Sequence, residues 1–216
     1  MGLARLQLIL AALIFLPAGT IHYWQAWLFW VVFFACVVWI TFHFLKTDPH
    51  LIENRMTAGP RAEQEKSQKI IQAITGALAA ALVIVPALDF RFHGASVPTP
   101  IVLLADALVV ASFIMIARVF RENSFAASTI KVEPGQRVIS TGPYAIVRHP
   151  MYTAGSIGIL AAPLTLGSWW GLLVGCAMVA GIIARLLDEE RYLSANLPGY
   201  DAYRGKVKYR LVPMVW

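Results

Sequence analysis

Two charged clusters near the end of the sequence contain residue types that can bind a charged ligand. The first is TGPYAIVRHPMY, residues 141–152, in which Arg148 and His149 are adjacent and are flanked by two prolines and two tyrosines. Pro143 and Pro150 fix their own backbone and restrict the preceding residue, so we predict an ordered turn. The donors of Arg and His, with the tyrosine rings, suit a ligand that has a planar ring and an anionic end. Anchoring of a helix at the lipid headgroups explains the same residues equally well.

The second cluster, residues 184–213, adds the opposite charge. In a helix that continues through Glu190, Arg185 and Glu189 are four residues apart and share a face, which Asp188 and Glu190 flank. A surface ion pair is the simplest explanation of this spacing. However, a partly buried charge at the point where a helix leaves a membrane needs a partner or a ligand, which favours a functional pair.

The rest of the chain is apolar enough to place these clusters beside a bilayer. Of the 216 residues, 58% are hydrophobic and only 14% are charged, whereas about a quarter of the residues of a soluble domain are charged. A membrane span needs roughly 20 apolar residues, and uncharged or nearly uncharged runs recur along the sequence. These runs are 6–21, 24–45, 70–88, 101–117 and 151–184.

The last run, 151–184, has Pro163, Gly167 and Ser168 near its middle. It is too long for one span and short for two, so we predict two tilted half-length helices joined by a tight turn. The predicted fold is an all-α integral membrane protein with five to six transmembrane helices. We expect the C-terminal hairpin to bring the two charged clusters to one cytoplasmic face, where they form a polar pocket.

Basic residues predict the orientation, because cytoplasmic loops are rich in Lys and Arg. With both termini inside, all the Lys and Arg except Arg91 lie on the cytoplasmic side. The net charge of +6 is explained by this bias and by contact with anionic membrane lipid, with no nucleic-acid partner. We expect a prokaryotic inner-membrane protein that is one domain, residues 1–216, divided into N-terminal helices 1–117 and a motif region 118–216. Its oligomeric state does not follow from the sequence.

Several other residues have structural explanations. Cys36 and Cys176 both lie in apolar runs, so we expect buried thiols, with no disulfide and no metal site. Gly171 and Gly175 have the GxxxG spacing that allows helices to approach closely. Asp106 is ionisable within an apolar run, and an internal hydrogen bond is a simpler expectation for it than substrate handling.

Ordered motifs across the C-terminal half resemble a known family. GQRVISTGPYAIVRHPMY, residues 135–152, precedes ARLLDEERYL, residues 184–193, and PGYDAYRGKVKYRLVP, residues 198–213. Together they resemble the membrane-embedded methyltransferases typified by isoprenylcysteine carboxyl methyltransferase (ICMT), with the related phospholipid methyltransferases. The resemblance extends over residues 120–213. No GxGxxG loop is present, which disfavours a soluble Rossmann-type methyltransferase.

The resemblance implies S-adenosyl-L-methionine as the methyl donor and S-adenosyl-L-homocysteine as the product. It also implies that Arg185 is the catalytic residue that faces the methyl acceptor. The cofactor site it implies consists of Lys131, Gln136, Arg137, Val138, Ile139, Tyr144, His149, Pro150, Met151, Tyr152 and Glu189.

The acceptor is expected to be a small molecule or a lipid at the membrane, and the family resemblance favours a carboxyl group. A phospholipid amine or a thiol is the alternative within the family. Two interpretations from other functional classes stay open. One is an NADPH-dependent sterol-type reductase, although the chain is short for one, and the other is a non-enzymatic transporter or scaffold.

Overall fold

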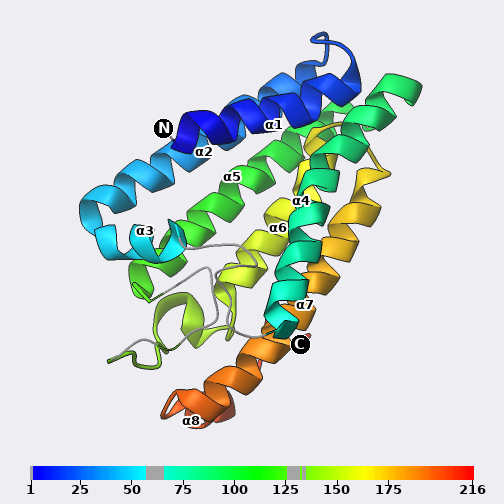
Figure 1. The fold of residues 1–216 in the computed structure, drawn as a ribbon. Helices are drawn as coiled ribbons and strands as arrows, with labels where there is room; N and C mark the ends of the chain where they lie inside the picture. Colours follow the sequence, from blue (N-terminus) through cyan, green and yellow to red (C-terminus); the bar gives the residue numbers. More distant parts are fainter. Residues whose placement is uncertain (1, 57–65, 126–131, 133–134) are drawn as a thin grey trace.

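The computed structural model describes residues 2–56, 66–125, 132 and 135–216, which are mostly helical (Figure 1). No strand occurs among these residues, so the predicted all-α fold is confirmed. The helices of the described segments are α1 (Gly2–Ala18), α2 (Trp24–Thr47), α3 (Pro49–Met56), α4 (Lys66–His93), α5 (Thr99–Glu122), the short 3-10 helix η1 (Gly142–Ala145), α6 (Pro150–Thr165), α7 (Gly171–Asn196) and α8 (Tyr200–Lys206).

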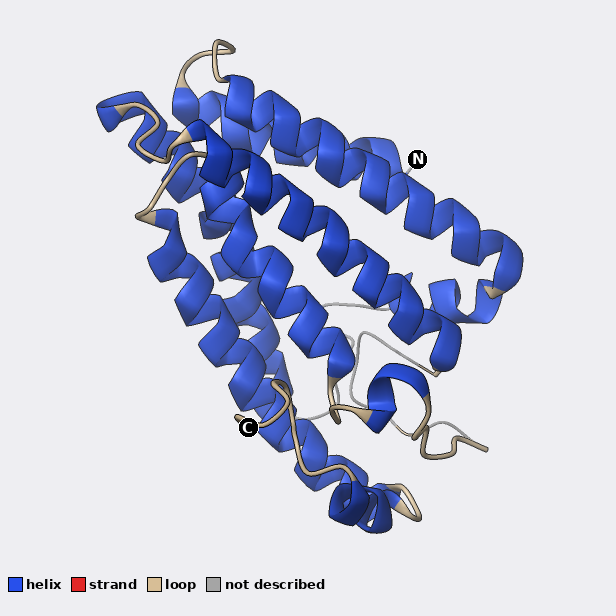
Figure 2. Ribbon diagram, turned by 180° about the vertical axis from the view of Figure 1, so that it is seen from behind, coloured by secondary structure: helices blue, strands red, loops and turns tan. Residues whose placement is uncertain are grey.

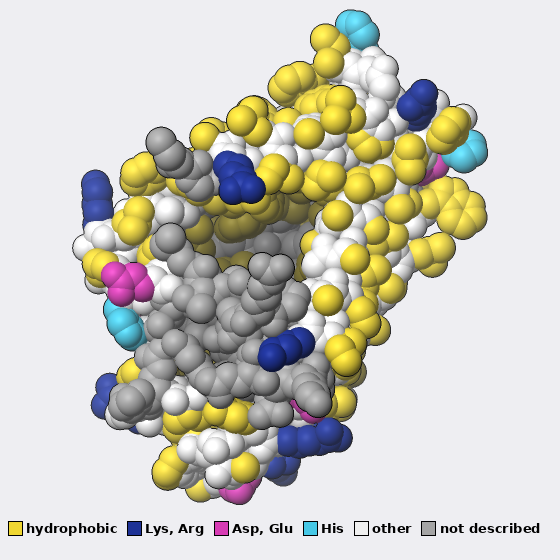
Figure 3. Space-filling view, in the orientation of Figure 1, with side chains coloured by type: hydrophobic (Ala, Val, Ile, Leu, Met, Phe, Trp, Pro, Cys, Tyr) yellow, Lys and Arg dark blue, Asp and Glu magenta, His cyan; other side chains and the backbone are white. Residues whose placement is uncertain are grey.

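Four helices of the described segments, α2, α4, α5 and α7, are long and apolar enough to cross a membrane. Large hydrophobic side chains are exposed along them, and apolar atoms cover most of the sides of the helices seen in Figure 3. The protein is therefore an integral membrane protein. Two shorter helices lie beside them: α1 has 17 residues and α6 has 16, about 24 Å of helix for α6 at 1.5 Å per residue. The number of spans, five to six, stays a prediction.

The long helices run back and forth, so that their connections gather at two ends of the bundle (Figures 1 and 2). At one end the connections after α1, α4 and α6 meet. The backbone N–H groups of Ser96 and Val97 donate to the carbonyl of Gly167, and the Tyr23 hydroxyl donates to the carbonyl of Leu166. The opposite end carries α3, α8, the start of α6 and the end of α7. The two predicted polar clusters therefore lie at the same end.

The predicted C-terminal hairpin is formed by α6 and α7, with the turn at residues 166–170. Gly167 adopts a left-handed conformation with φ +73°, which glycine takes without steric cost. The Ser168 hydroxyl accepts a hydrogen bond from the backbone N–H of Gly171 and donates to Asp89 of α4. The expectation of two half-length helices was wrong for α7, which has 26 residues and continues to Asn196, well past the end of the uncharged run at residue 184.

Gly171 packs against two proline rings and has no room for a side chain. A Cβ atom added there would lie 2.5 Å from Pro163 Cβ and 2.8 Å from Pro86 Cγ. Since rings held in helices move little, we expect Gly171→Ala to lower the free energy of unfolding by roughly 1–3 kcal/mol. Thermal unfolding in detergent tests this, with Gly155→Ala as the control because a Cβ at Gly155 meets nothing within 4 Å. Equal melting temperatures for the two variants would contradict the prediction.

Two expectations about isolated polar residues were wrong. The Asp106 carboxylate is buried in α5, and neither of its oxygens has a hydrogen-bond partner in the described part of the chain. The expected internal hydrogen bond is therefore not found. Cys36 is buried, but Cys176 is exposed on the surface of α7, because the first half of that helix forms an outer face of the bundle (Figure 1).

Candidate active site

A cleft lies at the end of the bundle where α6 begins and α7 ends. Its empty volume, which includes space open to solvent, is about 820 Å³. The walls come from residues 136–139, from the first turn of α6, from the polar half of α7 and from α8. The lining residues are Asn123, Phe125, Gln136, Arg137, Val138, Ile139, Tyr144, Arg148, His149, Met151, Tyr152, Arg185, Glu189, Leu193, Leu197, Tyr200 and Tyr203.

The turn before α6 is ordered, as predicted from its prolines. Residues 142–145 form the 3-10 helix η1, and Pro150 is the first residue of α6. The backbone N–H of Arg148 donates to the carbonyl of Tyr209 at 2.9 Å, and that of His149 to the carbonyl of Arg210 at 3.0 Å. The C-terminal segment therefore holds Arg148 and His149 by their backbone N–H groups, and the side chains of these two residues make other contacts.

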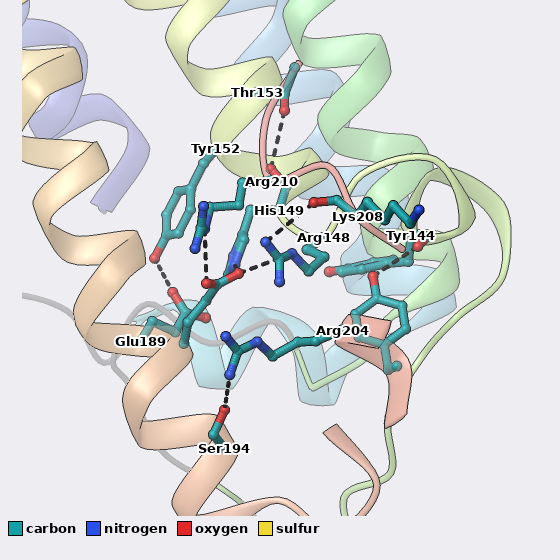
Figure 4. A network of polar contacts seen from close by, with 12 residues as sticks. Tyr144, Arg148, His149, Tyr152, Thr153, Glu189, Ser194, Arg204, Lys208 and Arg210 are labelled. Carbon is teal, nitrogen blue, oxygen red and sulfur yellow. Dashed lines mark hydrogen bonds and ion pairs between the residues drawn. The ribbon is translucent and has the colours of Figure 1, made fainter. Parts of the chain in front are cut away.

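The carboxylate of Glu190 joins three basic side chains, those of Arg148, His149 and Arg210. These three basic side chains are labelled in Figure 4, where they lie close together. Glu190 Oε1 lies 3.1 Å from Arg148 Nε and 3.3 Å from His149 Nε2, and Oε2 accepts a hydrogen bond from Arg210 Nε at 3.0 Å. The Glu190 side chain is only 5% exposed. A buried charge in this position needs such partners, so Glu190 links the start of α6, the end of α7 and the C-terminal segment.

A second chain of polar contacts faces the cleft. The Tyr152 hydroxyl donates to Glu189 Oε2 at 2.5 Å, and it accepts a hydrogen bond from Arg185 Nε at 3.2 Å. Arg185 and Glu189 do share a face of α7, as their spacing predicted, and Tyr152 of α6 lies between them. This arrangement fixes a cationic donor and an anionic acceptor side by side on one wall of the cleft.

Aromatic residues form the opposite part of the wall. The Tyr203 hydroxyl donates to the carbonyl of Tyr144 at 2.8 Å, and Asn123 Nδ2 donates to the Tyr144 hydroxyl at 2.9 Å. Burial, followed by the nearby Tyr144, raises the pKa of Tyr203 above its usual value of 10.0. The Tyr203 hydroxyl therefore stays protonated around neutral pH and remains a donor. The rings give the cleft an apolar, flat surface next to its charged groups.

Most of the residues predicted for the site line this cleft. Arg185 lies there beside Tyr152, and Pro150 lies just behind the wall, buried as the first residue of α6. Lys131 lies outside the described residues. The predicted residues that line the cleft are Gln136, Arg137, Val138, Ile139, Tyr144, His149, Met151, Tyr152, Arg185 and Glu189. Their roles toward a cofactor or an acceptor stay predictions.

The sequence reasoning missed several residues of the site. Leu193 follows Glu189 by four residues, so helical spacing was a usable signal for it. Leu197, Tyr200 and Tyr203 are positioned by the chain reversal at Gly199, which has φ +85°. Glu190 was expected only to flank the functional face, but the structure makes it the centre of the buried charge cluster.

Comparison with protein families identifies the region that contains this cleft. Residues 100–198 match the phospholipid methyltransferase family. The match confirms the family resemblance predicted from the sequence, and it extends from the start of α5 to the end of α7. It supports an enzyme that transfers methyl groups at a membrane. A comparison with curated proteins found no match to the chain.

The part that matches the phospholipid methyltransferase family contains the turn before α6 and the polar half of α7. Arg148, His149, Arg185 and Glu189 all lie within it, whereas α8 and Arg210 lie beyond its end at residue 198. The contacts of Arg210 with Glu190 and of Tyr203 with Tyr144 thus extend the site past the matched region.

Proposed function

We propose that the protein transfers a methyl group from S-adenosylmethionine to a lipophilic acceptor held at the membrane surface. The observation that carries the proposal is the cleft itself, in which Glu189, Tyr152 and Arg185 are linked on one wall at the end of a membrane-spanning helix. The match to the phospholipid methyltransferase family supports the reaction class.

The side chains of the cleft fit the chemistry of this cofactor. When bound, S-adenosylmethionine supplies a methyl group activated by a sulfonium. The Glu189 carboxylate accepts hydrogen bonds from an ammonium or a ribose hydroxyl, and a doubly protonated His149 ring, with Nε2 facing Glu190, has a second N–H to donate to a carboxylate. Leu193, Leu197 and Tyr200 give an apolar surface against which a flat purine ring packs.

We assign the binding of the acceptor to Arg185. Its guanidinium is anchored through Nε to Tyr152, and the fork of an arginine matches the two oxygens of a carboxylate or a phosphate. A lipophilic carboxylate is our first acceptor class, and a phospholipid amine or a thiol is the alternative. A carboxylate or thiolate needs no base at the moment of transfer, whereas a protonated amine must first lose a proton.

Catalysis in such a cleft rests on positioning. The acceptor atom must approach the methyl carbon to about 3–3.5 Å and in line with the leaving sulfur. Arg185 orients the acceptor, and Tyr152 holds Arg185 beside Glu189, which binds the cofactor. The exposed apolar flanks of α4 and α7 leave the acceptor's hydrocarbon part in the bilayer.

Calorimetry on the detergent-purified protein tests the cofactor site. We expect S-adenosylhomocysteine to bind the wild type, and we expect binding to weaken at least about tenfold in Glu189→Ala and His149→Ala, since a hydrogen bond to a charged group contributes roughly 1.5–3 kcal/mol. Asp201→Ala is the control, because the Asp201 side chain is 71% exposed and lies outside the cleft.

An acceptor screen in nanodiscs then separates the acceptor classes. Isoprenylated carboxylates, phosphatidylethanolamine and lipophilic thiols are each supplied with labelled cofactor, and the methylated product is identified by mass spectrometry. Failure of the folded wild type to bind S-adenosylhomocysteine would refute the proposal, and binding of a nicotinamide cofactor instead would favour a reductase.

A further inference from the structure

A second pocket lies on the outer side of the polar half of α7. It is lined by Leu187, Glu190, Arg191, Ser194, Arg204 and Arg210, and its empty volume is about 750 Å³. None of these residues lines the cleft described above. Three guanidinium groups from α7, α8 and the C-terminal segment therefore meet around a space that the proposed reaction does not use.

Two of these guanidinium groups are held in place by their neighbours. Arg204 Nη1 donates to Ser194 Oγ at 2.8 Å and to Asp201 Oδ1 at 3.3 Å. Arg210 donates through Nε to Glu190, and its guanidinium carbon lies 4.9 Å from the centre of the Trp216 ring. Anchored in this way, each arginine loses little side-chain entropy when its remaining N–H groups bind a ligand.

Donors are in excess of acceptors at this pocket. Arg204 Nε is buried and has no hydrogen-bond partner in the described part of the chain, and leaving such a donor unsatisfied costs roughly 1–3 kcal/mol. The lining carboxylate, Glu190, accepts from Arg210 but is also shared with Arg148 and His149, so it offsets only part of the charge of the three arginines. The pocket therefore favours an anion with several oxygen acceptors.

The position of the pocket indicates where such an anion comes from. Arg191 and Ser194 lie in the last turns of α7, a helix long enough to span the membrane, so the pocket lies at the level of the lipid headgroups. Basic pockets at this level bind the headgroups of anionic lipids. A phosphate group fits the forked donors of arginine better than a lone carboxylate does, because it offers more oxygens.

We propose that this pocket binds the phosphate of an anionic phospholipid, and that it is a lipid site separate from the methyl-transfer cleft. The lipid is not consumed there, since no residue of the pocket lines the cleft. Because Arg210 contacts Glu190, which in turn holds Arg148 and His149, a bound phosphate stabilises the C-terminal segment against the hairpin. The proposal does not depend on the identity of the acceptor.

Lipid titration of the full chain, purified in detergent and stripped of lipid, tests the proposal. The probes are short-chain phosphatidylglycerol, short-chain phosphatidylcholine and inorganic phosphate, and the readouts are the melting temperature and lipid adducts in native mass spectrometry. We expect phosphatidylglycerol to bind and to raise the melting temperature, with phosphatidylcholine much weaker because of its cationic choline. A response to inorganic phosphate equal to that of phosphatidylglycerol would identify the free anion as the source, whereas a response to the lipid alone would identify the headgroup.

Matched variants distinguish a specific lipid site from general attraction of anionic lipid to a positively charged surface. Arg204→Gln and Arg191→Gln are each expected to weaken phosphatidylglycerol binding about tenfold, the loss of one charge-assisted hydrogen bond. Lys206→Gln removes the same charge from an exposed position of α8 outside the pocket, and it is expected to bind like the wild type. The Arg191→Gln variant is expected to fold like the wild type, because the Arg191 side chain is 81% exposed and its ion pair with Asp188 adds little stability. A loss of binding in this variant is therefore not caused by misfolding. Equal binding of both lipids, or equal losses in all three variants, would overturn the proposal.

Discussion

Replacement of Glu190 by alanine is expected to lower the free energy of unfolding by roughly 3–5 kcal/mol, the usual cost of removing one partner from a buried ion pair. The change leaves the Arg148 guanidinium, 6% exposed, without its carboxylate 3.1 Å away. It also frees His149 and Arg210 from the same group. Thermal and denaturant unfolding in detergent micelles measures the loss, which appears as a lower melting temperature.

Asp201→Ala is the matched control for the Glu190 variant. It also removes a carboxylate that contacts an arginine, at 3.3 Å, but the Asp201 side chain is 71% exposed. Exposed pairs of this kind contribute about 0–1 kcal/mol. Similar melting temperatures for the two variants would mean that Glu190 does not hold the site together. Glu190→Gln, which keeps the shape and loses the charge, is expected to lie between them.

Replacement of Arg185 by alanine is expected to slow methyl transfer by roughly 10²–10³-fold at saturating cofactor, the effect of losing one preorganised donor. The affinity for S-adenosylhomocysteine is expected to change only a few-fold, because Arg185 faces the acceptor in the proposed reaction. Initial rates in nanodiscs and calorimetry on the same preparation measure the two quantities separately.

Glu189→Gln is expected to show the opposite pattern, with weaker cofactor binding as the main defect. Tyr152→Phe is expected to impair both quantities, because its hydroxyl contacts both Arg185 and Glu189. If Arg185→Ala lost cofactor affinity as strongly as Glu189→Gln, the assignment of Arg185 to the acceptor would be wrong.

Helical spacing and proline positions were the sequence signals that located the cleft. The four-residue spacing of Arg185 and Glu189 predicted a shared face, and the structure places both on the cleft wall. Pro143 and Pro150 predicted an ordered turn, which is present. Both signals work because they depend on local backbone geometry, which neighbouring residues determine.

The central role of Glu190 did not follow from the sequence. Three consecutive acids end the apolar part of α7, and spacing alone does not tell which one becomes buried. The answer depends on Arg210, 20 residues further along, whose segment folds back over Arg148 and His149. Such contacts between distant segments depend on tertiary packing, about which a local pattern carries no information.

Helix lengths were the weakest part of the prediction of the fold. An uncharged run shows that a segment of the sequence is compatible with the lipid interior, but it does not show at which residue the helix ends. α7 continues to Asn196 because its polar half packs against α8 and the C-terminal segment, as in the cluster of Leu197, Tyr200 and Tyr203. α6 ends at Thr165 because the turn at Gly167 accepts hydrogen bonds from the backbone N–H groups of Ser96 and Val97.

The charge cluster joins the two ends of the α6–α7 hairpin, and this has a consequence for biosynthesis. Arg148 and His149 precede the hairpin and Glu190 lies near its end, so they meet only after the chain has crossed the bilayer and returned. A nascent chain whose hairpin is not yet inserted holds these charges apart in water. Under the proposed function, the cofactor site is therefore complete only after the hairpin has been inserted into the membrane.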